Sequence, residues 1–387
     1  MRVLLSGYYG FDNAGDEAVL YAIVQALRAE KPDIDITVLS NQPEHTSEQF
    51  GVKSVNRWGK IALLKAVKNC DVFISGGGSL LQDVTSKNGI LYYLGLIKLA
   101  QVMKKKVMIY AQGIGPVHNG CNRALVRKIL NKVNVITVRD LESRMELMQM
   151  GVYREIMVCA DPVLGIPADE VDAKIGKTLL EKGGVENYTR PILMVAARSW
   201  QNSGDLFEEI AAFCDDAVQN GWQIVFLPFH YPEDIETGKM IAAKMQHVQD
   251  VTVLQENYTP LETMHILKNA DMILGMRLHS LIMGATLQKP MIALSYDPKV
   301  SSFMQLLRQR ECYGVRDVTA QQLIMAMQRL KNRSDKETAQ QAMLTEIMMR
   351  QAKEPIELLI QLFWANHVTA SPSSHKGIIP SMFLESV

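Results

Sequence analysis

Short apolar runs alternate with longer amphipathic stretches along most of this 387-residue chain, and this alternation constrains the fold more than any other feature. In the first half, the strand-like runs are 3–5, 34–39, 72–75, 107–111, 135–138 and 156–159. The stretches between them carry apolar residues at spacings of three and four, which predicts helices at 16–29, 60–68, 91–103, 123–132 and 141–150. Repeated strand–helix units form parallel sheets with helices on both faces, so we expect an α/β fold.

The alternation stops after the sixth strand and then begins again. Strand-like runs return at 192–197, 224–228, 251–254, 272–274 and 291–295. Because the chain is about two and a half times as long as a typical domain, we predict two doubly wound parallel-sheet domains that face each other across a cleft. We place them at 1–165 and 191–335, with 166–190 as the connection. A helix at about 336–366 is expected to pack back on the first domain, followed by a poorly ordered tail at 367–387.

Charge and cysteine usage limit where such a chain acts. Lys plus Arg and Asp plus Glu both number 41, so no net positive charge favours nucleic acid as a partner. The first apolar run holds only three residues before Ser6, too few for a signal peptide. The longest apolar run, 90–102, falls short of the ~20 residues that cross a bilayer. Five scattered cysteines indicate reduced thiols, and we expect a cytoplasmic protein.

In doubly wound sheets, ligands bind beyond the carboxyl ends of the strands, where loops and helix N-termini present backbone N–H groups. The first such loop, GYYGFDNAGDEAVL at 7–20, lacks the spacing of a dinucleotide-binding fingerprint. Helix capping alone would explain Asn13 and Asp16, while Gly15 permits close backbone approach. Asp16 and Glu17 are adjacent acids, which leaves a role as general base open.

Three further strand exits in the first half carry glycines or an arginine. SGGGSLLQD, at 75–83, suits either a backbone cradle for an anion or a sugar, or a simple tight turn. AQGIGP, at 111–116, again places glycines at a strand end. In VRDLESR, the first arginine is either a fork for a carboxylate or phosphate, or part of a network with Asp140. The candidate binding residues in these loops are Gly76, Gly77, Gly78, Ser79, Gln82, Asp83, Gln112 and Arg139.

Two strand exits in the second half carry cationic side chains. GMRLHSLIMGA places an arginine and a histidine after one apolar strand, and SYDPKVSSF places an aspartate and a lysine after the next. We therefore expect the histidine and the lysine to face the same crevice. A histidine in that place suits a proton donor or a phosphate ligand, because imidazole titrates near neutral pH. With one more histidine, from PFHYPED, the candidates are Arg277, His279, Tyr296, Asp297, Lys299 and His230.

Several motifs that would indicate other chemistry are missing from the sequence. It contains no HExxH, GxSxG, Walker loop or paired CxxC, and its one DxD, at 33–35, lies at the start of a strand instead of its exit. We therefore expect no catalytic metal. The cationic side chains would then have to orient an anionic substrate and offset developing charge by themselves.

Six blocks occur in order along the chain, namely NAGDEA, GGGSLLQD, QGIGP, VRDLES, GMRLHSLI and YDPKVSSF. Together they resemble the polysaccharide pyruvyl transferase family, and within it the CsaB-type enzymes that pyruvylate bacterial secondary cell-wall polymers. The resemblance runs from residue 1 to about 310. It implies a GT-B-like fold of two facing Rossmann-type domains, with phosphoenolpyruvate as donor and no cofactor. The implied product is a 4,6-linked pyruvate ketal on N-acetylmannosamine of a lipid-diphosphate-linked precursor, in S-layer anchoring.

Carried over by motif, the resemblance implies that Arg277, His279 and Lys299 bind and activate phosphoenolpyruvate. It places the NAGDEA and GGGSLLQD loops on the acceptor side, and Arg139 is a further candidate contact to the donor. Two other functions fit the same loops. One is a metal-independent GT-B glycosyltransferase that uses a nucleotide sugar, and the other is a sugar-binding protein without activity.

Basic residues recur near the end of one expected helix and along the next: Lys104, Lys105, Lys106, Arg123, Arg127, Lys128 and Lys132. They would form either an ordinary solvated face or a basic surface beside the acceptor domain. Because the implied acceptor is attached to a lipid, such a surface predicts reversible peripheral contact with a negatively charged membrane leaflet.

Overall fold

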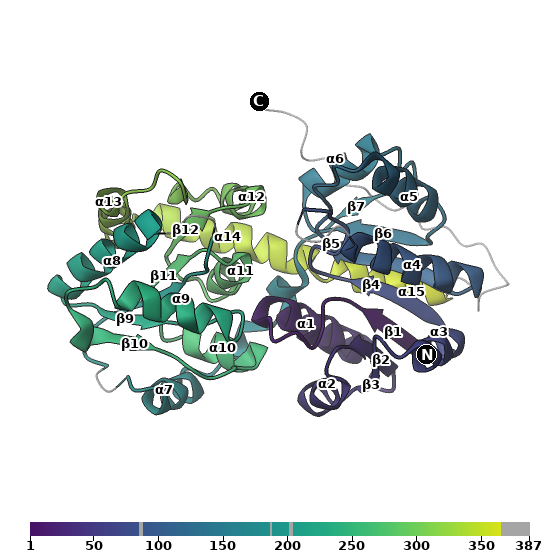
Figure 1. Cartoon of the computed structure of the whole chain (residues 1–387), viewed down its shortest axis with the longest axis horizontal. Coiled ribbons are helices and arrows are strands. Elements are labelled where there is room, and N and C mark those ends of the chain that lie inside the picture. The colour runs from purple at the N-terminus through teal and green to yellow at the C-terminus, as the bar shows by residue number, and fades with distance from the viewer. Residues whose placement is uncertain (85–87, 186–187, 201–203, 365–387) are drawn as a thin grey trace.

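Two α/β domains lie side by side in the computed structural model, which describes residues 1–84, 88–185, 188–200 and 204–364 (Figure 1). The first domain has a seven-stranded sheet of order β3-β2-β1-β4-β5-β6-β7, and the second has a six-stranded sheet of order β10-β9-β8-β11-β12-β13. All neighbouring strands in these two sheets are parallel. The predicted fold class is therefore confirmed. The expected tail at 367–387 lies outside the described residues.

Helices cover both faces of each sheet. The strands of the first domain are β1 (Arg2–Ser6), β2 (Asp35–Ser40), β3 (Lys53–Asn56), β4 (Val72–Gly76), β5 (Lys106–Gln112), β6 (Val135–Val138) and β7 (Met157–Val158). Its helices are α1 (Ala14–Glu30), α2 (Pro43–Phe50), α3 (Lys60–Asn69), α4 (Gly89–Val102), α5 (Gly120–Leu130) and α6 (Leu141–Gln149). The 3₁₀ turns η1 (Pro162–Gly165) and η2 (Ala168–Glu170) and helix α7 (Ala173–Lys182) follow.

The second domain repeats this arrangement. Its strands are β8 (Ile192–Ala196), β9 (Gln223–Phe226), β10 (Val251–Val253), β11 (Met272–Gly275), β12 (Met291–Ser295) and β13 (Cys312–Gly314). Its helices are α8 (Gly204–Gln219), α9 (Glu233–Ala242), α10 (Pro260–Leu267), α11 (Leu278–Thr286), α12 (Pro298–Leu306) and α13 (Ala320–Lys331), with the 3₁₀ turn η3 (Val248–Asp250). In both domains the central strands are buried along their whole length, as their near-continuous apolar composition predicts.

The last two helices run from the second domain to the first, as the yellow ribbon in Figure 1 shows. Helix α14 (Asp335–Gln351) packs against α11 and η1, and α15 (Glu354–Trp364) packs against β5, β6 and α1. The break between them falls at Ala352 and Lys353, because Pro355 fits the first turn of a helix but not its interior. Residues 365 and 366, the last of the expected helix, lie outside the described residues.

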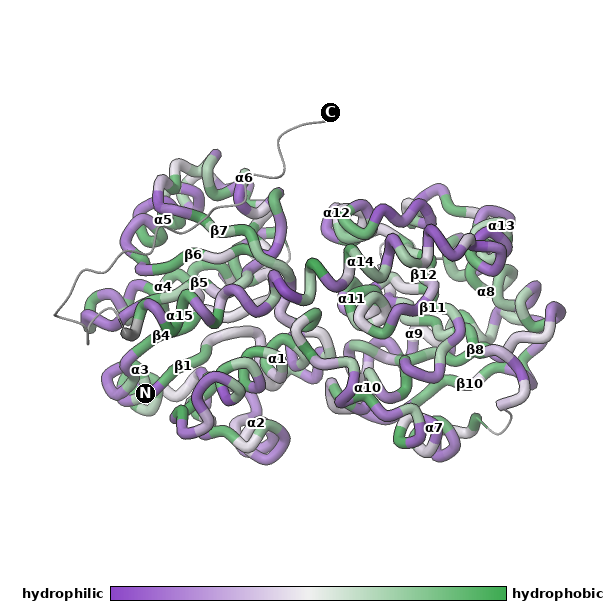
Figure 2. Tube along the Cα trace, turned by 180° about the vertical axis from the view of Figure 1, so that it is seen from behind, coloured by the Kyte–Doolittle hydropathy of each residue, from purple (hydrophilic) through white to green (hydrophobic). Residues whose placement is uncertain are grey.

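One apolar core continues across the junction of the domains. It joins the α1 face of the first sheet to the α10 and α11 face of the second, through η1. Two further cores fill the opposite face of each sheet. Figure 2 shows the hydrophobic stretches concentrated in the strands, with hydrophilic stretches along the outer helices. Among the described helices, none combines the length and apolarity needed to cross a bilayer.

Candidate active site

The carboxyl ends of the two sheets face each other, and the loops that follow the strands touch directly. The loop before α1 pairs with the loop after β9, because Ala14 N–H donates to Phe229 O at 2.7 Å and Tyr231 N–H donates to Asp12 O at 3.0 Å. Helix α1 also packs against α10 and α11 (Figure 1). Strand exits from both domains therefore contribute to one site.

A lysine from one domain and an arginine from the other meet on a single serine hydroxyl. Lys299, in the first turn of α12, reaches across the domain junction and donates to Ser79 Oγ at 3.0 Å and to Gly115 O at 3.2 Å. Arg139, after β6, donates to the same Ser79 Oγ at 3.1 Å. Among the described residues, Lys299 forms no ion pair, and burial together with the Arg139 charge lowers the pKa of its ammonium. The arrangement suits an anion at Ser79.

Asp161 holds the cationic side chains of both domains in place. Its carboxylate accepts a hydrogen bond from Arg139 Nη1 at 2.9 Å and lies 3.7 Å from His279 Nε2. Burial alone would raise the pKa of Asp161, but the His279 and Arg139 side chains and the Val163 N–H hold it well below its ordinary value. A carboxylate in this place keeps the arginine fixed and puts a negative charge beside the imidazole.

His279 lies in the first turn of α11, directly against the first turn of α1. A Cβ atom at Gly15 would lie 2.2 Å from His279 Nδ1, so only glycine leaves room for the ring. The Nε2 atom is buried and, among the described residues, has no hydrogen-bond partner. The imidazole is therefore positioned by both domains, with Nδ1 against Gly15 and Nε2 facing Asp161.

Asp16 is an acidic side chain of this site that forms no ion pair with a described residue. Its carboxylate is partly exposed and accepts no hydrogen bond among the described residues, and it lies so close to the glycine loop that a Cβ at Gly78 would be 2.6 Å from its Oδ1. Burial raises the pKa of Asp16, although the charges of His279 and Arg139 act in the opposite direction. A carboxylate whose pKa is raised is a better proton acceptor than an ordinary one.

Two neighbours of Asp16 fix the loop instead of facing the cleft. Asn13 caps α1, because its side chain accepts hydrogen bonds from the N–H groups of Gly15 and Asp16 at 3.1 and 3.3 Å. Glu17 is buried and accepts the Gly10 N–H at 2.7 Å. Burial raises the pKa of Glu17 to about 8. These contacts bear out the capping alternative for Asn13.

The glycine loops make room for side chains. Gly77, with φ of +30°, packs so tightly on α1 that a Cβ would lie 1.9 Å from Val19 Cγ1, and a Cβ at Gly76 would lie 2.8 Å from Tyr9 Oη. In QGIGP, a Cβ at Gly113 would lie 2.8 Å from Arg139 Nη2. Neither a simple tight turn nor a ligand cradle is needed to explain these glycines, since each faces a side chain of its own chain.

Arg277 and His230 lie at the edge of this group. Arg277 donates from Nε and Nη2 to the two carboxylate oxygens of Asp234, at 3.0 and 2.5 Å. Asp234 also accepts the N–H groups of Phe229 and His230, so the pair fixes the loop that touches α1. The His230 ring lies 3.5 Å from Glu233. The guanidinium of Arg277 is thus engaged within its own domain.

The remaining candidates are placed around the site or away from it. Gln112 is buried behind the glycine loop and donates to Ser75 Oγ at 2.7 Å. Gln82 accepts the Val84 N–H at 2.8 Å. Asp83 ties its loop to the start of α5 by accepting two N–H groups and the Asn122 amide.

Two candidates of the second domain flank Lys299. Tyr296 accepts a hydrogen bond from Arg198 Nη1 at 2.9 Å and contacts Trp200 with the two rings tilted by 44° and their centroids 4.8 Å apart. Asp297 caps α12 by accepting the Lys299 N–H at 2.9 Å. Asp297 therefore directs the start of the helix that carries the lysine.

Sequence reasoning missed two aspartates that organise the site, Asp161 and Asp234. Asp161 follows the sixth expected strand directly, so the rule used for the other loops would have found it. Asp234 lies in the first turn of α9 and gave no signal, because its role depends on Arg277, 43 residues later. Among the described residues, no group of three or more His, Cys, Asp or Glu side chains is placed to hold a metal ion.

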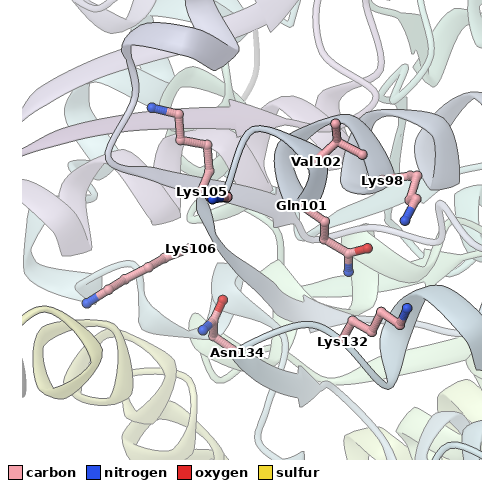
Figure 3. A pocket seen from close by; sticks show the side chains of 8 residues that line it. Lys98, Gln101, Val102, Lys105, Lys106, Lys132 and Asn134 are labelled. Atoms are coloured by element: carbon pink, nitrogen blue, oxygen red, sulfur yellow. The ribbon is translucent and has the colours of Figure 1, made fainter.

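Four of the seven residues expected in the basic surface, Lys104, Lys105, Lys106 and Lys132, lie at the amino ends of the strands of the first sheet, where β5 and β6 begin. Arg123 instead forms an ion pair with Glu146 at 2.7 Å, and Arg127 and Lys128 do not line this pocket. Five lysines line a pocket of about 370 Å³ there: Lys98, Lys104, Lys105, Lys106 and Lys132. Figure 3 shows Lys98 and Lys132 on either side of Gln101, while Lys105 and Lys106 point away. Lys105 donates to Lys68 O at 2.6 Å, and Lys106 donates to Leu362 O.

Comparison with known families and proteins gives a specific match. The family model described as "Polysaccharide pyruvyl transferase" matches residues 13–298, which contain Asp16, Ser79, Arg139, Asp161 and His279. The amylovoran biosynthesis protein AmsJ of Erwinia amylovora is 19% identical, in an alignment that covers 79% of this chain and 86% of that protein.

Solved structures agree in fold with both domains together. MnaA of S. aureus with UDP has a TM-score of 0.64 at 15% identity and covers 97% of this chain and 99% of its own. UDP-GlcNAc 2-epimerase from Neisseria meningitidis has a TM-score of 0.64 at 14% identity, with 93% and 100% covered. E. coli ADP-heptose lps heptosyltransferase II has a TM-score of 0.51 at 14% identity, with 85% and 98% covered. These likenesses identify the GT-B fold.

Proposed function

The chain belongs to the polysaccharide pyruvyl transferase family, and from this membership we propose that it forms a pyruvate ketal on a sugar of its acceptor, using phosphoenolpyruvate. The family transfers pyruvyl groups onto polysaccharide. The donor, the ketal linkage and the roles of individual residues are the proposal. One observation carries it, namely that Lys299 and Arg139 come from opposite domains and meet at Ser79.

Phosphoenolpyruvate carries a carboxylate and a phosphate, and the site offers two cations for them, Lys299 and Arg139. Lys299 has no carboxylate partner among the described residues, so an incoming anion would replace Ser79 and Gly115 as its ligand. Arg139 donates from Nη1 to Asp161 and from Nη2 to Ser79 Oγ. Cations held in this way orient the donor and offset the charge that develops on the leaving phosphate.

His279 and Asp16 are the proposed proton donor and acceptor. The sugar hydroxyl oxygen adds to C2 of the donor while C3 gains a proton from His279, which gives a phosphoketal. Breakage of the bond between C2 and the phosphate oxygen releases phosphate, and a second hydroxyl oxygen of the same sugar then bonds to C2. Asp16 accepts the hydroxyl protons. One of these protons returns to His279 in place of the proton given to C3, and the other leaves with the phosphate.

Arg277 and Asp234 are proposed to position this site without touching the donor. Their ion pair fixes the turn at Phe229 and His230, which touches the start of α1, where Asp16 lies. The pair also fixes the first turn of α11, because Arg277 precedes the helix that carries His279.

For the acceptor we propose the 4- and 6-hydroxyls of N-acetylmannosamine in a lipid-diphosphate-linked precursor of a secondary cell-wall polymer, with a role in S-layer anchoring. The six sequence blocks that resemble CsaB-type enzymes support this assignment. The enzyme would then act on the cytoplasmic side of the membrane and meet it through the lysines of the first domain.

The test is incubation of the purified chain with phosphoenolpyruvate and a synthetic acceptor ending in N-acetylmannosamine, in excess chelator. We expect phosphate release that depends on the acceptor, and an acceptor whose mass rises by one pyruvate ketal. A parallel reaction supplies sugar nucleotides instead. Nucleotide release there, with no phosphate release from phosphoenolpyruvate, would identify a glycosyltransferase and overturn the proposal.

A further inference from the structure

Aromatic side chains gather beside the cleft, at the carboxyl ends of β1 and β3, and the chemistry proposed above does not use them. Tyr8 and Phe11 belong to the loop after β1, Trp58 follows β3, and Tyr92 and Tyr93 lie on α4. Tyr8 and Phe11 stack with ring centroids 4.1 Å apart and an angle of 8° between the rings. Trp58 and Tyr92 lie 5.4 Å apart. We call these five residues the aromatic platform.

A buried arginine holds the platform together. The Arg57 guanidinium carbon lies 4.7 to 5.5 Å from the ring centroids of Phe11, Trp58, Tyr92 and Tyr93. Its nitrogens donate to Gly7 O at 2.9 Å and Tyr93 Oη at 3.1 Å. The side chain is only 4% exposed and, within the described residues, forms no ion pair. A cation that contacts several rings at once fixes them relative to one another.

Two platform rings remain open to solvent although they are held rigidly. Trp58 is 59% exposed, yet its indole N–H donates to Asn41 Oδ1 at 2.9 Å and Arg57 lies over its ring. Tyr8 is 37% exposed, while Phe11 stacks on its ring. Rigid aromatic rings with one exposed face bind flat, weakly polar ligand faces well, because the rings lose little side-chain entropy when the ligand binds.

The platform is continuous with the proposed active site. Tyr8 and Phe11 belong to the loop that leads into α1, where Asp16 lies. Asp12 in the same loop accepts the Tyr231 N–H of the second domain at its carbonyl oxygen, at 3.0 Å. Trp58 lies at the far end, since β3 is two strands away from β1. With strands about 4.8 Å apart, the exit of β3 lies about 10 Å from the exit of β1, the length of about two sugar residues.

We propose that the aromatic platform binds the sugar residues of the acceptor that precede the one receiving the pyruvyl group. The apolar C–H faces of pyranose rings stack on Trp58 and Tyr8. This inference rests on the proposed function, because it takes the reacting sugar to lie at Asp16. Arg57 is a positioning residue, since its guanidinium is covered by the rings.

The experiment compares Trp58→Ala with the wild-type enzyme on two acceptors, N-acetylmannosamine alone and an oligosaccharide of two to four sugars that ends in it. We expect the KM for the oligosaccharide to rise about 10-fold, with kcat and the KM for phosphoenolpyruvate unchanged, and the KM for the monosaccharide to change less than about twofold. Trp58→Phe keeps a ring and should recover part of the affinity. Tyr153→Ala is the matched control, because Tyr153 is 81% exposed but lies outside the platform.

A second measurement does not depend on turnover. The oligosaccharide is titrated into each protein by calorimetry, with no phosphoenolpyruvate present. Loss of affinity in Trp58→Ala, but not in Tyr153→Ala, supports the platform even if the pyruvyl transfer assay fails. Equal affinity and equal KM in wild type and Trp58→Ala overturn the platform while leaving the proposed reaction intact. Arg57→Met should weaken oligosaccharide binding and leave the monosaccharide KM unchanged, which loss of folding would not do.

Discussion

At the scale of single residues, the site depends on a buried aspartate that contacts cations from both domains. Asp161 bonds Arg139 of its own domain and lies 3.7 Å from His279 of the other. Removing one member of a buried ion pair leaves the other charge without compensation, which costs more than the pair contributes. The effect of Asp161 should therefore appear in stability and in catalysis together.

Asp161→Asn should lower the free energy of unfolding by about 3 kcal/mol and kcat/KM by about 100-fold or more. The amide cannot neutralise Arg139 and no longer places a negative charge 3.7 Å from His279 Nε2. Chemical denaturation and steady-state kinetics measure the two effects. Asp215→Asn is the control, because Asp215 is also buried and accepts the Gln246 and His247 N–H groups away from the cleft. An Asp161 variant with the activity of this control would assign Asp161 to folding alone.

Glu17 predicts how stability depends on pH. Burial raises the pKa of Glu17 from 4.5 to about 8, so between these values the unfolded chain has released a proton that the folded chain retains. Raising the pH from about 5 to 8 therefore favours unfolding. Glu17→Gln keeps an acceptor for the Gly10 N–H but cannot ionise. Its stability should equal that of wild type near pH 4.5 and exceed it by about 4 kcal/mol at pH 8.

Thermal melts of both proteins across this pH range are the measurement. The gap between the two curves should open as pH rises. Parallel curves would show that the Glu17 carboxyl is ionised in the folded protein over the whole range.

At the scale of elements, glycines let helices and loops approach the functional side chains. Gly15 on α1 faces His279, Gly78 after β4 faces Asp16, and Gly113 after β5 faces Arg139. Each glycine belongs to a different block of the sequence and accommodates one side chain of the proposed site. These glycines therefore reflect packing around the proposed site, and Gly15 does so across the junction of the domains.

Gly15→Ala tests this account. Its Cβ would lie 2.2 Å from His279 Nδ1, so the imidazole or α1 must move, and we expect kcat/KM to fall at least about 100-fold. Helix propensity alone would favour alanine by about 1 kcal/mol. Gly95→Ala on α4 is the control, because no atom lies within 4 Å of its Cβ position, and this variant should be more stable and fully active. Full activity of Gly15→Ala would remove His279 from the catalytic step.

The central strands of both sheets could be predicted from sequence because they are buried along both faces. The edge strands β3 and β13 could not, since Lys53–Asn56 and Cys312–Gly314 are short, half exposed and mostly polar or small. Helix α7 within the expected connection was missed for a similar reason, because it lies on the surface. In the site, strand exits predicted Ser79, Arg139, His279 and Lys299 together. The pairing of Arg277 with Asp234 depends on tertiary contact and leaves no local pattern.

At the scale of the whole molecule, the lysine pocket lies at the amino ends of the strands of the first sheet, and the proposed active site lies at their carboxyl ends. Lys106 begins β5 and Gln112 ends it, so about 20 Å of strand separates them. Membrane contact through the lysines would then turn the cleft away from the lipid. An acceptor attached to the membrane would need a glycan long enough to bridge this distance, or release of the enzyme from the surface.

The chain should therefore bind anionic vesicles at low salt and leave them at high salt, since each lysine near the surface contributes about 1 kcal/mol. The double variant Lys98→Glu and Lys132→Glu reverses the two charges beside Gln101 and should abolish sedimentation with vesicles. Its kcat on an acceptor without lipid should match wild type, because the cleft is distant. Equal sedimentation of wild type and variant would make the lysines an ordinary solvated face.

The central claim is that cations of the two domains hold phosphoenolpyruvate while its pyruvyl group becomes a ketal. Carbon NMR of a reaction with phosphoenolpyruvate labelled at C2 tests it most directly. With wild-type enzyme and acceptor, we predict that the label appears as a ketal carbon on the sugar, and that Lys299→Ala abolishes this signal while circular dichroism stays unchanged. Label that stays in phosphoenolpyruvate or becomes free pyruvate with wild-type enzyme, or an undiminished ketal signal with Lys299→Ala, would contradict the account.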